Sequence, residues 1–338
     1  MSAYLKGEEA RVVTADHIDR ISKTASLNDA LAVIAGTDIG DNLQQAPIRT
    51  FDELDECLWK YLREYIACLE AFKLLPDDMR KVLTAYLVKY DVFNIKAALH
   101  RSLIGKKASM LPLGVIYNNG LLDELSGAEN IDAITELLVK CRLTNYASVL
   151  KKCVMDGGAK SKLLAETKLD EEYYGSFLNE MKGIRDGFLV AKAIGLTVDL
   201  ANLQIASRAI IQGIGLEVAD YIIPSGYMLS TAAIRELLSL KLTDMPARLR
   251  STIYYDVAED ISSSYNRTRS VTCVDEIIDK YRSRLVREIL SPRILSPSVL
   301  AWHLHVKELE MRNLRVVLKA MFDSIPVEEI RHRLVIAS

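Results

Sequence analysis

The chain has 338 residues, 50% of them hydrophobic and 26% charged, and its formal net charge is −2. Such a composition is typical of a globular protein, and the length predicts two or three subdomains rather than one hydrophobic core. The balance of charges excludes a bulk electrostatic field that would recruit nucleic acid or anionic lipid.

The cysteines and the N-terminus indicate a cytosolic setting. The 5 cysteines are odd in number and show no metal-ligand spacing, so we expect neither a disulfide framework nor a zinc site. The first residues, "MSAYLKGEEARVV", carry charges where a signal peptide needs its apolar region. The longest uncharged run, residues 108–122, is shorter than the roughly 20 residues that a membrane helix needs. We therefore expect no segment that spans a bilayer.

The first predicted unit ends near Lys107 and begins with small helical hairpins. A long amphipathic helix should follow the capping-box pattern Thr50-x-x-Glu53, because the threonine hydroxyl can bind an unpaired amide and the acid suits the helix dipole. Pro76 should separate this helix from the next one, since proline fits helix starts. That next helix contains "YDVFNIKAALHR" at 90–101, in which a primary amide lies within an apolar stripe.

The second and third units repeat this plan. Each opens on a Pro-x-Gly loop, continues with a long helix that we expect to begin at a Thr-x-x-Asp cap, and ends on a helix with a similar signature. The landmarks of the second unit are Pro112-x-Gly114, Thr167-x-x-Asp170 and "VDLANLQIASRA" at 198–209. Those of the third are Pro224-x-Gly226, Thr272-x-x-Asp275, Pro297 and "ELEMRNLRVVLKA" at 308–320.

The three signatures share one layout around an asparagine. Residues three and four apart on a helix share a face, so the asparagine should lie in the buried stripe. An acid three residues earlier should stand at the edge of that stripe, where it could accept a hydrogen bond from the amide, and a long polar residue two positions later should face water. The asparagines are Asn94, Asn202 and Asn313, the acids are Asp91, Asp199 and Glu310, and the long residues are Lys96, Gln204 and Arg315.

This recurrence predicts a structural role. A buried amide without a partner costs on the order of 1–3 kcal/mol, so the repeated asparagine implies a repeated and satisfied polar contact rather than a catalytic or ligand site.

The fold class follows from the same pattern. Strand propensity is confined to the isolated segments 251–255 and 333–338, so we expect an all-α chain. A repeat of roughly 110 residues favours small globular domains over a solenoid. We therefore predict three similar helical domains, 1–107, 108–219 and 220–338, related by a pseudo-threefold arrangement or set in a row.

No motif indicates catalysis. The segment "DGGAKSK" at 156–162 lacks the glycines of a phosphate loop. His303 and His305 are two residues apart and would point to different sides of a helix, so they cannot share a metal ion. We expect no catalytic residue, cofactor or metal site, although an enzyme site assembled from distant residues stays open.

The first and third signatures carry a family resemblance. The matching residues are Tyr90, Asp91, Asn94, Ile95 and Lys96 in the first, and Lys307, Glu308, Glu310, Asn313, Leu314 and Arg315 in the third. With these motifs the chain resembles, over essentially its whole length, the C subunit of archaeal-type rotary ATPases, which corresponds to the d subunit of eukaryotic vacuolar ATPases. The middle copy departs from the pattern at Gln204.

The resemblance implies a funnel of three similar domains on the cytoplasmic face of the cell membrane. Its partners would be the membrane rotor ring of proteolipid subunits and the central shaft, whose foot the funnel would hold. The implied role is a non-catalytic central-stalk (rotor) subunit in ATP-driven or ATP-producing proton or sodium transport, without nucleic acid, cofactor or a direct bilayer span. The alternative is a helical scaffold that binds an unrelated partner. We expect the uncharged joints 108–122 and 221–234 to meet a partner.

Overall fold

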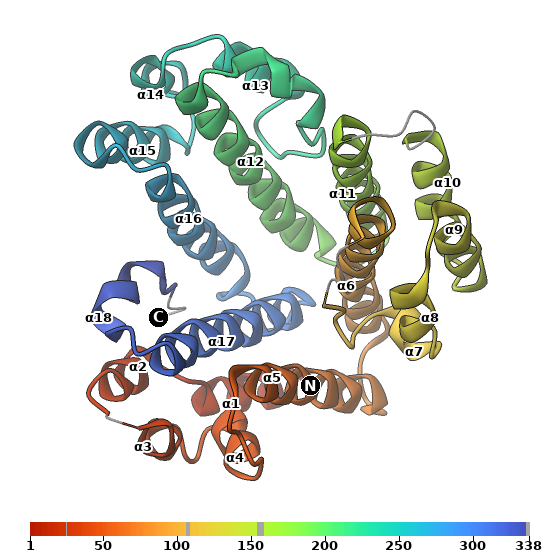
Figure 1. Cartoon of the computed structure of the whole chain (residues 1–338), viewed down its shortest axis with the longest axis vertical. Coiled ribbons are helices and arrows are strands. Elements are labelled where there is room, and N and C mark those ends of the chain that lie inside the picture. Colours follow the sequence, from red (N-terminus) through yellow and green to blue (C-terminus); the bar gives the residue numbers. More distant parts are fainter. Residues whose placement is uncertain (25, 106–108, 154–158, 336–338) are drawn as a thin grey trace. The chain divides into compact units, whose positions relative to one another are not determined.

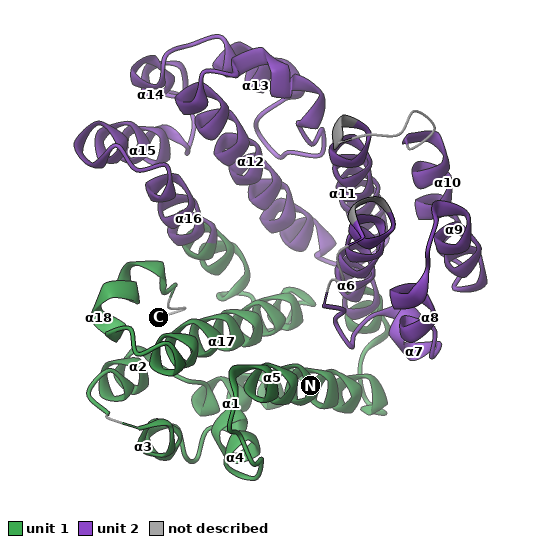
Figure 2. Cartoon of the chain, viewed as in Figure 1, with its two compact units in different colours: residues 1–82, 283–338 green, residues 83–282 purple. Residues whose placement is uncertain are grey.

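The computed structural model of the chain describes residues 1–338 apart from 25, 106–108, 154–158 and 336–338. Its described residues form helices, turns and irregular segments and no β-strand, so the all-α prediction is confirmed (Figure 1). The chain divides into two compact units (Figure 2): unit 1 contains residues 1–82 and 283–338, and unit 2 contains residues 83–282. The three domains expected from the sequence remain a prediction.

Unit 1 combines the two ends of the chain. Its elements are α1 (Ser2–Glu8), η1 (Glu9–Arg11), α2 (Ala15–Ile21), α3 (Leu27–Val33), α4 (Asp38–Gln44), α5 (Phe51–Ala71), α17 (Ser298–Phe322), α18 (Val327–Ile330) and η4 (Arg331–Arg333). The division between the units falls within α6 (Asp77–Ile104) and α16 (Thr272–Leu290).

Unit 2 contains the remaining helices. They are α7 (Val115–Asn118), α8 (Leu122–Gly127), α9 (Ile131–Lys140), α10 (Thr144–Cys153), α11 (Ala159–Met181), α12 (Gly187–Gln212), η2 (Gly215–Tyr221), α13 (Thr231–Leu238), η3 (Leu242–Asp244), α14 (Met245–Arg248) and α15 (Tyr255–Thr268). The short helices α9 and α10 pack together, α10 packs on α11, and α13 packs on α12.

The core of unit 1 forms between two long helices, α5 and α17, which pack together. The predicted capping box opens α5: the Glu53 N–H donates to the Thr50 hydroxyl at 3.2 Å, and the Thr50 N–H donates to the Glu53 carboxylate at 3.1 Å. A stripe of apolar side chains at helical spacing then turns inward along α5, and its buried members are Leu54, Leu58, Tyr61, Leu62, Ile66 and Leu69. Burial of this stripe stabilises the pair.

The predicted cap at Thr167 is wrong, and the one at Thr272 lies at the start of its helix but one residue inside it. Thr167 lies inside α11, where its hydroxyl donates back to the Leu163 carbonyl, because nothing in the preceding residues stops the helix from extending upstream. Thr272 is the first residue of α16, and its N–H donates to the Ser270 hydroxyl. The prolines behave as expected, since Pro76 immediately precedes α6 and Pro297 is the N-cap of α17.

α12 is the most apolar of the long helices, and among the described residues it alone has the length and composition to cross a membrane. The expectation that no segment spans a bilayer stays a prediction, because the core helix of a soluble protein passes the same test of length and composition. Half of its most apolar window is buried within the protein. Asp199 and Asn202, near its middle, are buried as well. These features fit the central helix of a packed unit, which is apolar nearly all round.

Candidate functional site

Each signature asparagine holds the backbone of one residue downstream with two hydrogen bonds. Asn94 Nδ2 donates to the Leu111 carbonyl oxygen at 2.9 Å, and the Leu111 N–H donates back to Asn94 Oδ1 at 2.7 Å. The corresponding distances are 2.7 and 3.0 Å for Asn202 with Ile223, and 2.7 and 3.1 Å for Asn313 with Val335. We call each such asparagine, with the acid three residues before it, a clamp.

The clamps explain why an amide lies in an apolar stripe. All three asparagines are buried, as the sequence predicted. An amide can donate and accept at once, so it pairs both backbone groups of a segment that has left regular secondary structure. Those groups would otherwise lack partners inside the protein.

The acids do not bind the amides, contrary to expectation, and they are buried rather than at the edge of the stripe. Their carboxylates accept backbone N–H groups just before or at the start of a following helix. Asp91 accepts the N–H groups of Val115 and Ile116 at 2.8 and 2.9 Å. Asp199 accepts those of Tyr227, Met228 and Leu229 at 3.2, 2.7 and 3.2 Å, together with the Tyr254 hydroxyl at 2.6 Å. Carboxylates suit such positions because helix starts leave amides unpaired.

The two Pro-x-Gly loops need their glycines at these contacts. A Cβ built on Gly114 would lie 2.5 Å from Asp91 Oδ1, and one on Gly226 would lie 2.0 Å from Asp199 Oδ1. Gly114 also has a positive φ of 97°, which side chains disfavour. The glycines therefore let the backbone approach the carboxylate closely.

The third clamp draws its two partners from opposite ends of the chain. Asn313 binds Val335, whereas Glu310 accepts the Val13 N–H at 2.6 Å. Val13 stands just before the capped start of α2. In the first two clamps both partners belong to one loop of a few residues. α17 thus joins the N-terminal and C-terminal segments of unit 1.

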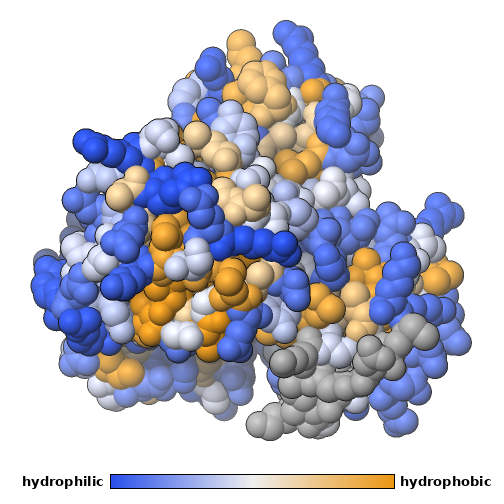
Figure 3. All heavy atoms as spheres, turned by 90° about the horizontal axis from the view of Figure 1, so that it is seen from above, coloured by the Kyte–Doolittle hydropathy of each residue, from blue (hydrophilic) through white to orange (hydrophobic). Residues whose placement is uncertain are grey.

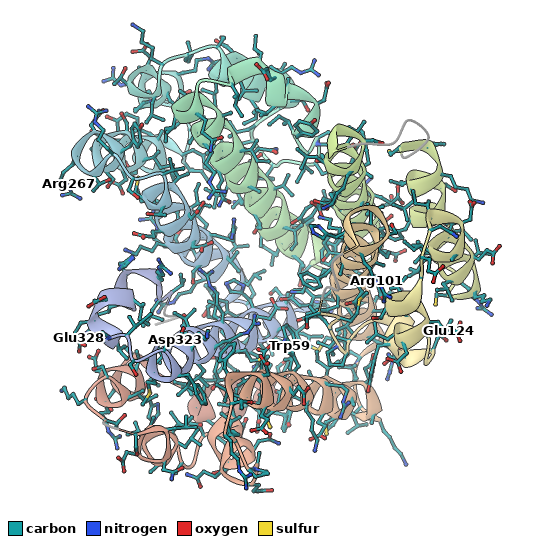
Figure 4. The ribbon with its side chains drawn as sticks, viewed as in Figure 1. Trp59, Arg101, Glu124, Arg267, Asp323 and Glu328 are labelled. Carbon is teal, nitrogen blue, oxygen red and sulfur yellow. The ribbon has the colours of Figure 1, made fainter. Side chains whose placement is uncertain are left out.

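A buried lysine distinguishes the third clamp further. Lys307 is fully buried, and its Nζ donates to Tyr61 at 3.0 Å, to Glu310 at 3.2 Å and to Asp38 at 3.3 Å. Asp38 also pairs with Arg11 at 2.8 Å. The equivalent positions in the other signatures hold Val88 and Leu196. On the exposed side of the same helix, Lys319 pairs with Asp323, which is labelled in Figure 4.

Burial shifts the pKa of several of these groups. It raises the pKa of Asp91 to about 7, although the N–H groups of Ile116 and Val115 oppose the shift. Burial likewise raises the pKa of Asp199 and of Glu310, with Tyr254 and Lys307 respectively as the strongest opposing influences. Burial, helped by the nearby Lys307 charge, lowers the pKa of His303 to about 3, so this imidazole is neutral beside Tyr65.

The long polar residues of the signatures link successive repeats. Lys96 on α6 pairs with Asp170 on α11, and the Gln204 amide on α12 donates to Asp275 on α16 at 2.6 Å. Arg315 on α17 binds Asp55 on α5 at 3.0 Å. The signature helices α6, α12 and α17 are thus bonded to α11, α16 and α5, the long helices that precede the signature helices of the second, third and first repeats. The long polar residues were expected to face water, and no local sequence pattern indicated their partners on the other helices.

Sequence reasoning missed Lys307, Tyr254 and the backbone partners of the amides. Lys307 had one available signal, because it precedes Glu310 by three residues and so shares its helix face. The joints 108–122 and 221–234 supply clamp partners, and Leu111, Ile116, Ile222 and Ile223 within them are buried. Their contact with a partner remains a prediction. The described residues contain no group of three or more His, Cys, Asp or Glu side chains arranged to hold a metal ion.

The chain matches a known family over nearly its whole length. A sequence model of the family described as "ATP synthase (C/AC39) subunit" matches residues 1–333. The chain belongs to this family. Its members include the C subunits of A-type ATP synthases, with which the resemblance drawn from Asn94 and Asn313 agrees.

Several curated relatives, all C subunits of A-type ATP synthases, match most of the chain at low identity. The protein of Methanocaldococcus jannaschii is 22% identical over 99% of this chain and 85% of its own length. That of Methanobrevibacter smithii is 24% identical over 94% of this chain and 83% of its own length. That of Methanosphaera stadtmanae is 26% identical over 78% of this chain and 70% of its own length.

Proposed function

We propose that this protein is a non-catalytic central-stalk component that couples the rotating shaft of an A-type or V-type ATPase to the membrane rotor ring. The family match over residues 1–333 carries the proposal. In this role the protein serves ATP-driven or ATP-producing transport of protons or sodium ions on the cytoplasmic face of the membrane, and it performs no chemical step itself.

The internal bonding of the chain suits a part that transmits torque. Such a part needs segments that hold their relative positions under load, and long helices with fixed ends provide them. α6, α12 and α17 have 28, 26 and 25 residues. A buried clamp on each of them fixes the segment that follows, and a hydrogen bond shielded from water is stronger than an exposed one.

The order of the inter-repeat bonds supports the three-domain arrangement that we propose. Within the units, the first signature helix binds α11 of the second repeat, the second binds α16 of the third, and the third binds α5 of the first. A row of repeats would lack the third of these bonds, which joins the last repeat to the first. We therefore propose three repeat domains, 1–107, 108–219 and 220–338, in a closed pseudo-threefold funnel that receives the shaft.

Reconstitution tests this function directly. The purified chain is mixed with the shaft subunits and with detergent-solubilised ring, and the products are separated on a native gel. We expect one complex that contains all three components. If shaft and ring behave as they do in its absence while this chain stays monomeric, the proposal is wrong and the protein is a helical scaffold for some other partner. Lys319→Met, at an exposed position on α17, serves as the control variant and should assemble normally.

A further inference from the structure

The most exposed large hydrophobic side chains occupy the same place in each repeat. Leu295 is 94% exposed, Leu74 is 78% exposed and Phe188 is 67% exposed, and these are the three highest values among the large hydrophobic residues that the structure describes. Each lies in or next to the turn that joins a signature helix to the long helix before it. The turns link α5 to α6, α11 to α12 and α16 to α17. We call these turns the hairpin tips.

Basic residues accompany the apolar side chains at every tip. Lys73 adjoins Leu74, and Arg293 precedes the exposed pair Ile294 and Leu295. Lys182 and Arg185 precede Phe188, and all four basic side chains are exposed. The acidic pair Asp77 and Asp78 belongs to the first turn of α6, where the helix dipole favours acids, and Arg80 and Lys81 follow it.

Two of the tips lie at the same end of unit 1. α17 runs antiparallel to α5, because His303 contacts Tyr65 near the end of α5, whereas Arg315 contacts Asp55 near its start. The start of α17 therefore lies beside the end of α5. This places the turn containing Leu74 and the turn containing Leu295 at one end of the helix pair.

The opposite ends of the signature helices differ in character. There the chain continues into the clamped segments, whose Leu111, Leu113, Ile222 and Ile223 side chains are buried. Exposed apolar side chains occur there as well, among them Leu216, Tyr227 and Met228, but none is as exposed as the three at the tips. On the face drawn in Figure 3, orange hydrophobic residues lie among blue hydrophilic ones.

We propose that the hairpin tips insert into an anionic lipid bilayer surface. Apolar side chains flanked by Lys and Arg are the pattern of interfacial anchors, since the apolar groups enter the boundary of the acyl chains while the cations meet anionic headgroups. The bilayer boundary takes up apolar side chains without a shaped pocket, whereas a protein partner would have to supply a matching pocket for each tip. The inference rests on the proposed function only in that the latter brings the protein to a membrane.

Vesicle binding tests this inference without the other ATPase subunits. The full chain is sedimented with vesicles of phosphatidylglycerol and, separately, of phosphatidylcholine, and the partition coefficient is measured at low and physiological salt. We expect binding to phosphatidylglycerol that weakens with salt, and little binding to phosphatidylcholine. The triple variant Leu74→Ser, Phe188→Ser, Leu295→Ser should lower the partition coefficient roughly tenfold or more, because the apolar insertion is lost.

Matched variants separate the tips from general hydrophobicity. Val139 and Leu216 are 53% and 58% exposed but lie away from the tips, so Val139→Ser with Leu216→Ser should bind as the unmodified chain does. Replacing Lys73 and Arg293 by Gln should weaken binding by about fivefold for each charge. Circular dichroism establishes that every variant is folded, as expected for changes at exposed positions.

Two results would overturn the inference. One is equal binding to both kinds of vesicle, or none, by the unmodified chain. The other is undiminished binding by the triple tip variant. If the chain binds no vesicles but the triple tip variant fails to enter the complex of ring and shaft, the tips contact a protein instead, and the proposed function stands.

Discussion

The first two clamps and the third perform the same task with different chemistry. Asp91 and Asp199 accept bonds from short loops of their own unit, and hydrophobic residues stand at the position that Lys307 occupies on α17. Glu310 binds a segment from the far end of the sequence and is paired with a buried cation. Where one continuous loop closes the structure, backbone groups bind the acid, joined at Asp199 by the Tyr254 hydroxyl, and no cation is present. Where two distant segments must be joined, an ionic cluster has been added.

Removal of the buried cation should have the largest effect. Lys307→Met leaves the buried Glu310 carboxylate without its cation, while Asp38 keeps Arg11, and should lower the free energy of unfolding by about 3–5 kcal/mol. Urea denaturation measures the change. Lys319→Met on the exposed side of α17 is the matched control and should change stability by less than about 1 kcal/mol. Equal losses in the two variants would show that the cluster does not hold unit 1 together.

The pH dependence of stability should report on the first clamp. The pKa of Asp91 is raised from 3.8 to about 7 in the folded protein, so the folded state holds its proton more tightly than the unfolded chain. The contribution of Asp91 to stability is therefore full below pH 3.8, falls as the pH rises, and is lost above about 7, a total change of about 4 kcal/mol. Asp91→Asn should remove this part of the slope. A variant with the same slope as the unmodified protein would contradict the assignment.

Replacing a clamp asparagine should have the next largest effect on stability. Replacing Asn94 or Asn202 by Leu leaves one buried N–H and one buried C=O unpaired and should destabilise the protein by about 2–4 kcal/mol. Asn313→Leu should have a smaller effect, because Asn313 is 6% exposed whereas the other two are fully buried, so water can reach the freed groups more easily. Thermal denaturation of the three variants compares them. A larger loss of stability in Asn313→Leu than in the other two variants would contradict this prediction.

Substitutions at the glycines separate two causes of lost stability, the clash of an added methyl group with a carboxylate and the cost of a positive φ. Gly226→Ala places a methyl group against the Asp199 carboxylate, and Gly114→Ala adds a positive φ to a similar clash. Gly213 has a positive φ of 73° with open space around it, so Gly213→Ala isolates the backbone term, about 1–2 kcal/mol. We expect Gly114→Ala to exceed it by about 1 kcal/mol or more through the clash. Equal losses of stability in Gly114→Ala and Gly213→Ala would mean that the Asp91 carboxylate moves away from the added methyl group at no cost.

The bonds between repeats should matter least to stability. Lys96 and Asp170 are partly exposed, with 26% and 32% of their side chains accessible. Lys96→Met should therefore change the free energy of unfolding by about 1 kcal/mol or less. The same variant is a sharper probe in the assembled complex, where we expect weaker retention of the shaft. If the Lys96→Met variant retains the shaft as well as the unmodified protein does, the bonds between repeats do not contribute to coupling.

The sequence predicted the helices and the three buried amides because both depend on local spacing. Periodicity placed Asn94, Asn202 and Asn313 on apolar faces, and Thr50, Pro76 and Pro297 marked true helix starts. The bonding partners could not be derived in this way, since they lie in irregular segments whose path depends on packing. Thr167 misled for a related reason: helix propensity upstream of it outweighed a local capping pattern.

The contact between the third clamp and the N-terminal segment could not be predicted from the sequence either. Nothing local in "KELEMRN" indicates that Glu310 binds Val13, because that contact joins residues almost 300 positions apart. A search for the acid's partner next to each signature would succeed at Asp91 and Asp199 and fail at Glu310.

Amide hydrogen exchange at Leu111, Ile223 and Val335 tests the repeated clamp most directly. Each of these N–H groups donates to a buried asparagine, so all three should exchange far more slowly than amides in exposed turns. Replacing one asparagine by leucine should remove protection at its own partner while the other two stay protected. Rapid exchange at these amides in the unmodified protein would contradict the account.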